Sequence, residues 1–120
     1  MSEFNCESVR ADVEAVCAMF RTLLVEMGFD LTLVPEPLFE QCSVATVTDH
    51  LDGEQRITGQ WKREDGSSFA NFIRYANGSM FAEQDVLLAH PTKPELFVEA
   101  LEVWGKPGRL KHDLRLLPAL

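Results

Sequence analysis

Three glycine-containing turn signals at nearly even spacing constrain this chain more than any other feature of its sequence. Asp52-Gly53, Asp65-Gly66 and Asn77-Gly78 divide residues 42–90 into four stretches rich in apolar residues. Asn or Asp followed by Gly favours a hairpin, because these residues accept the positive φ that tight turns require. The spacing therefore predicts four strands that pair in sequence order as an antiparallel meander.

The alternation of apolar and polar residues selects the loop lengths, because a shift of one residue moves every side chain of a strand to the other face. Two-residue turns throughout would mix charged and apolar side chains on both faces. Three-residue loops at Leu51–Gly53 and Glu64–Gly66, with a two-residue turn at Asn77-Gly78, separate them. The predicted apolar face then carries Ala45, Val47, Ile57, Trp61, Phe69, Ile73, Tyr75, Met80, Ala82, Val86 and Leu88. The predicted polar face carries Thr46, Thr48, His50, Arg56, Thr58, Gln60, Lys62, Arg74, Glu83 and Asp85, with Phe72, Phe81 and Leu87 as apolar exceptions.

Two segments outside the meander show helical spacing of apolar residues. Residues 6–27 repeat apolar side chains at three- and four-residue steps, and Gly28 suits the left-handed position beyond a helix end. Residues 92–104 begin with a capping box, Thr92 to Glu95, and stop before a glycine. We expect one α+β domain over residues 1–120, with an N-terminal helix, the four-stranded meander, a C-terminal helix and a leucine-rich tail. Both helices are expected on one sheet face, and residues 29–34 alternate like a short fifth strand.

The tail, residues 109–120, contains too many leucines to be left in solvent. It either packs over Phe72, Phe81 and Leu87 of its own sheet or crosses to another subunit, and the sequence leaves both possibilities open. Grouped aromatic residues on a surface are typical of interfaces. We therefore predict an interaction patch formed by Phe72, Phe81, Leu87, Leu114, Leu116 and Leu117.

The predicted register also sets Arg56 directly opposite Arg74, with Thr48 beside Arg56. Like charges opposite each other are destabilising unless something neutralises them. An acidic group of a ligand or partner could bridge the two arginines, so these three residues form a candidate anion-binding site. The alternative is that both arginines extend into water or lean on neighbouring side chains.

No motif for catalysis or metal binding occurs in the sequence. His50, His90 and His112 have no carboxylate or thiolate at metal-ligand spacing, and no nucleotide, dinucleotide or hydrolase motif is present. Glu83 and Asp85 share one strand face about 7 Å apart, which would suit paired acid and base groups, but a salt-bridged outer face is the preferred interpretation. The sequence thus predicts no catalytic residues, no metal site and no cofactor.

Charge and cysteine content argue against several classes of partner. The chain has 11 Lys and Arg against 19 Asp and Glu, a net charge of -8, and no basic run that would bind nucleic acid or an anionic membrane. Residues 1–10 lack the apolar core of a secretory signal, and no run reaches membrane-spanning length. Three cysteines without CxxC spacing fit reduced thiols, so we expect a cytoplasmic protein.

Two functional hypotheses follow. The first is a non-catalytic, acidic, cytoplasmic protein that acts through protein–protein interaction, as a homodimer that uses the predicted patch. The second is a small-molecule-binding protein or enzyme, with a pocket between the curved sheet and the helices. The sequence favours the first hypothesis over an enzyme.

Overall fold

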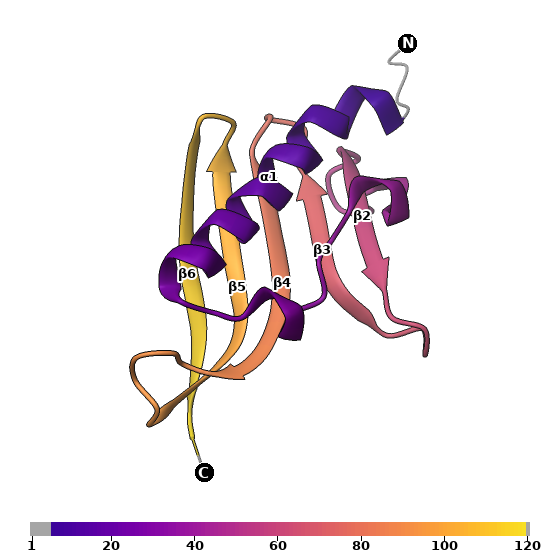
Figure 1. Ribbon diagram of the computed structural model, residues 1–120. Coiled ribbons are helices and arrows are strands. Elements are labelled where there is room, and N and C mark those ends of the chain that lie inside the picture. Colours follow the sequence, from indigo (N-terminus) through magenta and orange to yellow (C-terminus); the bar gives the residue numbers. More distant parts are fainter. Residues whose placement is uncertain (1–5, 120) are drawn as a thin grey trace.

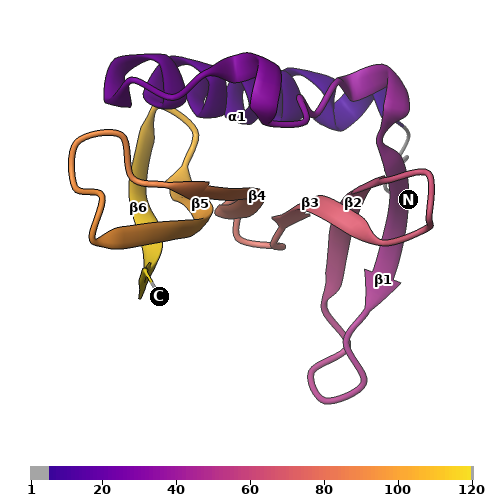
Figure 2. The same ribbon diagram turned by 60° about the horizontal axis from the view of Figure 1, so that its bottom comes forward.

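One long helix lies across one face of a six-stranded antiparallel sheet (Figures 1 and 2). The computed structural model describes residues 6–119; residues 1–5 and 120 lie outside the described residues. The strands occupy the sheet in sequence order, and each neighbouring pair is antiparallel. The elements are α1 (Cys6–Met27), η1 (Leu31–Leu33), η2 (Phe39–Gln41), β1 (Ser43–Thr48), β2 (Gln55–Lys62), β3 (Ser68–Arg74), β4 (Met80–Ala89), β5 (Leu96–Lys106) and β6 (Arg109–Pro118).

The N-terminal helix is confirmed, and its end is fixed by local hydrogen bonds. The Gly28 N–H donates to the Val25 carbonyl and the Phe29 N–H donates to the Leu24 carbonyl, each at 3.0 Å. Gly28 has a φ of +95°, which is the left-handed conformation that this pair of hydrogen bonds requires. The chain therefore leaves α1 sharply and returns along the same side of the sheet (Figure 1).

The predicted C-terminal helix is wrong, because residues 96–106 form β5. The prediction rests on the helical spacing of Phe97, Ala100, Leu101 and Trp104, and the buried residues Val98, Leu101 and Val103 also include a three-residue step. A β-bulge at Glu99 produces that step by inserting one residue between two regular alternations. The predicted capping box lies in the loop before β5, where the His90 Nδ1 accepts the Thr92 and Lys93 N–H groups at 3.2 Å.

Two further expectations about strands are corrected. Residues 109–118 form β6, which pairs with β5 of the same chain. A fifth short strand at residues 29–34 is wrong, because Leu31–Leu33 is a 3-10 turn. The Asp30 carboxylate begins that turn by accepting the Thr32 N–H at 3.0 Å. The sheet thus has six strands instead of four.

One of the three predicted loop lengths is confirmed. Glu64–Gly66 is a three-residue loop closed by the Arg63 N–H and the Ser67 carbonyl. The first loop has four residues, 50–53, because Asp49 pairs with Glu54. The third loop has three residues, 76–78, because the Tyr75 N–H donates to the Ser79 carbonyl. A bulge also shifts the β2–β3 pairing between Trp61 and Lys62.

These shifts invert two strands relative to the predicted faces. β2 and β4 present the predicted residues to the helix, but β1 presents the opposite set, and so does β3 from Ala70 onwards, whereas Phe69 at the bulge is buried in the core as predicted. Phe72 is therefore buried under α1, at 1% exposure, and Ile73 faces outward with Phe81 as its cross-strand partner. The bulge and the longer third loop each move the register by one residue, so together they return β4 to its predicted orientation.

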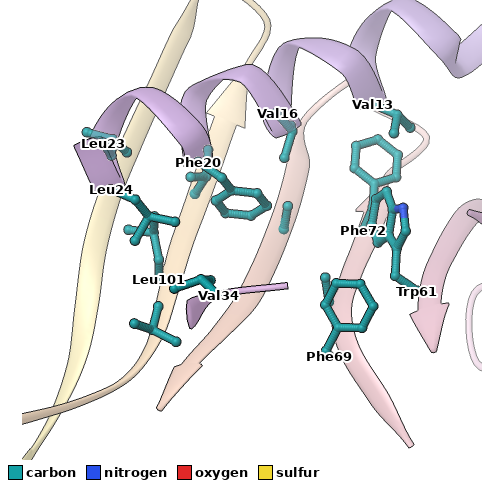
Figure 3. Packing of buried hydrophobic residues seen from close by; sticks show 14 of the residues in the cluster. Val13, Val16, Phe20, Leu23, Leu24, Val34, Trp61, Phe69, Phe72 and Leu101 are labelled. Atoms are coloured by element: carbon teal, nitrogen blue, oxygen red, sulfur yellow. The ribbon is translucent and has the colours of Figure 1, made fainter. Parts of the chain in front are cut away.

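The hydrophobic core fills the space between α1 and the sheet (Figure 3). Val13 points from the helix towards Phe72 and Trp61, and Phe20 lies over the part of the sheet that carries Leu101 (Figure 3). The Trp61 ring is fully buried, and its indole N–H donates to the Leu38 carbonyl at 2.7 Å. Burial of these side chains is the main source of stability in a fold of this type.

Candidate functional site

The outer face of the sheet, opposite α1, is not covered by any of the described elements (Figure 2). Three large apolar side chains lie next to one another on this face, and we call Ile73, Phe81 and Trp104 the apolar row. Ile73 pairs with Phe81, and Phe81 pairs with Trp104. The Trp104 side chain is 37% exposed, and Ile73 and Phe81 are half-buried. Lys111, an exposed residue on the edge strand, ends the row.

An acidic row follows the apolar row along the strands. Glu83 pairs with Glu102, and Glu102 pairs with Asp113, so three carboxylates lie side by side on the outer face. Arg115 is their main counter-charge: it forms ion pairs with Glu83, Glu99 and Glu102. Like charges on adjacent strands repel one another, so this row depends on that guanidinium.

At the acidic row, the pKa values of Glu102 and Arg115 are shifted from their usual ranges. Desolvation, followed by the hydrogen bond with Glu83, raises the pKa of Glu102 above the usual range of a glutamate. The hydrogen bond with Glu83 also raises the pKa of Arg115, which stays charged. The row is a salt-bridged surface whose carboxylates Glu83 and Glu102 share the Arg115 guanidinium.

A basic row lies on the other side of the apolar row. Lys106 pairs with Arg109 next to the turn that joins β5 and β6, and both residues are exposed. Side chains alternate along a strand, so this pair shares the outer face with Trp104 and Lys111. Basic, apolar and acidic rows therefore succeed one another on β5 and β6, each about 7 Å from the next.

The structure brings together only part of the predicted interaction patch. Phe81 lies in the apolar row, Leu87 is half-exposed at a bulge in β4, and Leu117 pairs with Phe97 at the far end of the sheet. Phe72 and Leu114 lie on the helix side. Leu116 pairs with the buried Val98, although it is 41% exposed at the sheet edge.

The candidate anion site is not assembled. Ile57, not Arg56, pairs with Arg74, so the two arginines lie on opposite faces of the sheet. Arg56 forms an ion pair with Asp49 at 3.0 Å and lies over the Tyr75 ring. Arg74 forms an ion pair with Asp12 of α1 at 3.2 Å. Thr48 pairs with Gln55 at the end of β1 and contributes to neither arginine's ion pair.

The pair Glu83 and Asp85 does lie on one face, with partners other than those expected from the sequence. Arg115 binds Glu83, and Arg63 binds Asp85 at 2.9 Å. Within residues 9–119, no three histidine, cysteine or acidic side chains are arranged to hold a metal ion. In the same part of the chain, no helix combines the length and apolarity needed to cross a membrane.

Sequence reasoning missed Ile73, Trp104 and the basic row as surface features. The sequence pattern predicts Trp104 in a helix and Ile73 on the buried face, so it predicts neither on the outer surface. A scan against protein families and searches of curated proteins and solved structures find no significant match to this chain. The surface chemistry of the chain itself is therefore the basis for assigning a function.

Proposed function

We propose that this is a non-catalytic interaction protein of the cytoplasm, which forms a homodimer through the outer face of its sheet. The observation that carries this proposal is the uncovered apolar row of Ile73, Phe81 and Trp104. Adjacent large apolar side chains on an open face are typical of interaction sites, and aromatic residues are enriched at interfaces. Among the residues that the structure describes, Cys17 forms no disulfide, which fits a reducing compartment.

The charge pattern supports a second copy of the chain as the partner. A two-fold axis that runs along the apolar row packs this row against itself. The same rotation places the basic row of each copy, Lys106 and Arg109, over the acidic row of the other copy. The interface therefore contains two such contacts. Attraction between these rows offsets the repulsion between two molecules that each carry a net charge of -8.

Sedimentation equilibrium of the full chain tests this dimer. We expect a concentration-dependent dimer for the wild type and a folded monomer for Phe81→Asp, because the new carboxylate would lie in the desolvated centre of the interface. Leu51→Asp is the matched control: Leu51 lies in the loop before β2, is 97% exposed, and its substitution should leave the dimer intact. A wild type that stays monomeric at the highest concentration reached would refute self-association.

A charge exchange tests the proposed geometry separately. Arg109→Glu and Asp113→Lys each create two repulsive contacts in their own homodimer, so each variant alone should dissociate more readily than the wild type. An equimolar mixture should form a heterodimer, because both contacts between unlike variants are attractive again. A wild-type dimer whose two variants fail to associate when mixed would rule out this arrangement of the two faces.

A further inference from the structure

A cavity of about 160 Å³ lies on the helix side of the sheet, away from the proposed dimer face. It opens between the second half of α1, the chain that returns from this helix, and β4. Its walls are mostly apolar, and they include Phe20, Leu24, Leu31, Val34 and Pro37. A dry apolar cavity of about 150 Å³ is known to hold a benzene molecule, so this space accommodates one ring.

Gln84 lines this cavity and is the one polar side chain that is fully buried among the described residues. It is 1% exposed, and its cross-strand neighbours on β3 and β5, Ala70 and Leu101, are apolar and buried. Its Nε2 donates to the Pro35 carbonyl at 2.5 Å, but its Oε1 accepts no hydrogen bond from the described residues.

The orientation of the Gln84 amide follows from its neighbour. The Pro35 carbonyl can only accept a hydrogen bond, so the amide nitrogen must face it and the amide oxygen must face elsewhere. Buried acceptors in folded proteins almost always have a donor, supplied by protein, water or ligand. The unpartnered Oε1 beside an apolar cavity therefore indicates a missing donor.

We propose that this cavity binds a small neutral molecule, about one ring in size, with an apolar body and an O–H or N–H group that donates to Gln84 Oε1. A carboxylate or phosphate would bring another acceptor to that oxygen, and the apolar walls would not solvate its charge. The inference is independent of the proposed dimer, because the cavity and the apolar row lie on opposite sides of the sheet.

An exposed ion pair forms part of the cavity wall. Arg21 of α1 and Glu36 of the returning chain both line the cavity and lie 2.8 Å apart, with 59% and 50% of their side chains exposed. Exposed ion pairs contribute little to stability, so this link opens readily. The two charges compensate each other, which leaves this part of the wall without net charge and suited to an uncharged ligand.

Titration of the full-length protein with phenol and toluene, followed by calorimetry and NMR chemical shifts, tests this proposal. The two probes have nearly the same size, but only phenol donates a hydrogen bond. We expect phenol to bind the wild type about tenfold more tightly than toluene, which is the effect of one satisfied buried acceptor. Gln84→Met keeps the side-chain volume and removes the acceptor, so it should reverse this preference.

A second variant tests whether phenol binds in the cavity when the Gln84 amide is unchanged. Cys17 also lines the cavity, and Cys17→Met extends a side chain into this space while Gln84 remains. We expect this variant to lose phenol binding, whereas Phe81→Asp, on the other face, should keep it. Absence of phenol binding by the wild type, as in a cavity that takes only water, would overturn the proposal. The same conclusion would follow if Gln84→Met left the phenol-to-toluene ratio unchanged.

Discussion

The two faces of the sheet are built by alternate residues of the same strands, yet they differ in almost every physical property. The inner face is dry and apolar, with Gln84 as its one buried polar side chain among the described residues. The outer face has half-exposed apolar side chains between a basic and an acidic row. Packing against α1 explains the apolar residues of the inner face, since this is where apolar area is removed from water.

The outer face has no such explanation within one copy of the chain. A solvated sheet face needs only polar alternation, and neither Phe81 nor Trp104 is required to complete the core. In each strand, folding depends mainly on the alternate residues that face α1. The residues between them face outward, so their side chains can contact a partner without a change in the core. Substitutions on the two faces should therefore affect different properties of the protein.

The largest expected difference concerns the two tryptophans. Trp61→Ala should lower the free energy of unfolding by about 3–5 kcal/mol, because it removes a fully buried ring and its hydrogen bond to Leu38. Trp104→Ala should cost roughly 1 kcal/mol, because that ring is partly exposed on the outer face. Urea denaturation at one protein concentration measures both values. Equal losses would show that the outer face also carries the fold.

For some strands, the sequence predicts correctly which residues face α1 and which face outward. Strand β2 shows its expected face because polar residues alternate with Ile57 and Trp61 there, and β4 shows its expected face because the bulge and the longer third loop compensate each other. In β3 both alternating sets contain apolar residues, Phe69 with Ile73 and Ala70 with Phe72, so the pattern alone does not choose between faces. One bulged residue was then enough to invert the strand.

A sequence signal for the third loop was present. Asp65-Gly66-Ser67 and Asn77-Gly78-Ser79 have the same form, and in both the first side chain accepts the serine N–H at 2.9 Å. The shared pattern predicts the same three-residue loop twice. The four-residue first loop depends on Asp49, whose carboxylate accepts the N–H groups of Leu51 and Asp52. No comparable signal marks the bulge at Glu99, and this hid β5, Trp104 and the apolar row.

The candidate sites depended directly on these register errors. The predicted outer position of Phe81 agrees with the observed orientation of β4, whereas the predicted outer position of Phe72 is wrong because β3 is inverted there. The same inversion separated Arg56 from Arg74. The sequence gives no signal for Gln84, because an amide in a strand is ordinary until its burial and its unpartnered oxygen are known.

A smaller effect is expected at Leu87, where the strain lies in the backbone. It is the one described non-glycine residue with a positive φ, 56°, and it lies in the β4 bulge with 49% of its surface exposed. Leu87→Gly should raise the free energy of unfolding by up to about 1 kcal/mol, because glycine adopts this conformation without steric cost. Leu117→Gly is the control: this regular strand position should lose about 0.5–1 kcal/mol. A loss of stability at both positions would contradict strain at the bulge.

The smallest expected effect is a pH dependence that belongs to the outer face alone. The pKa of Glu102 is raised in the folded state, mainly by desolvation, while Glu83 and Asp113 add repulsion and Arg115 opposes it. Above the unfolded value of 4.5 the folded state therefore binds more protons at this group than the unfolded state does, so stability falls as pH rises through this window.

Glu102→Gln should remove the contribution of this group to the pH dependence of the free energy of unfolding. The variant should therefore lose less stability than the wild type between pH 4.5 and neutrality. Loop carboxylates with lowered pKa values, Asp30, Asp49 and Asp65, act in the opposite sense and lose their contribution as pH falls below 3.8. Denaturation curves of the wild type and of the variant across this range separate the two effects. If the free energy of unfolding of Glu102→Gln changed with pH above 4.5 as it does in the wild type, the acidic row would not oppose folding. That result would remove one argument for a basic partner of this row.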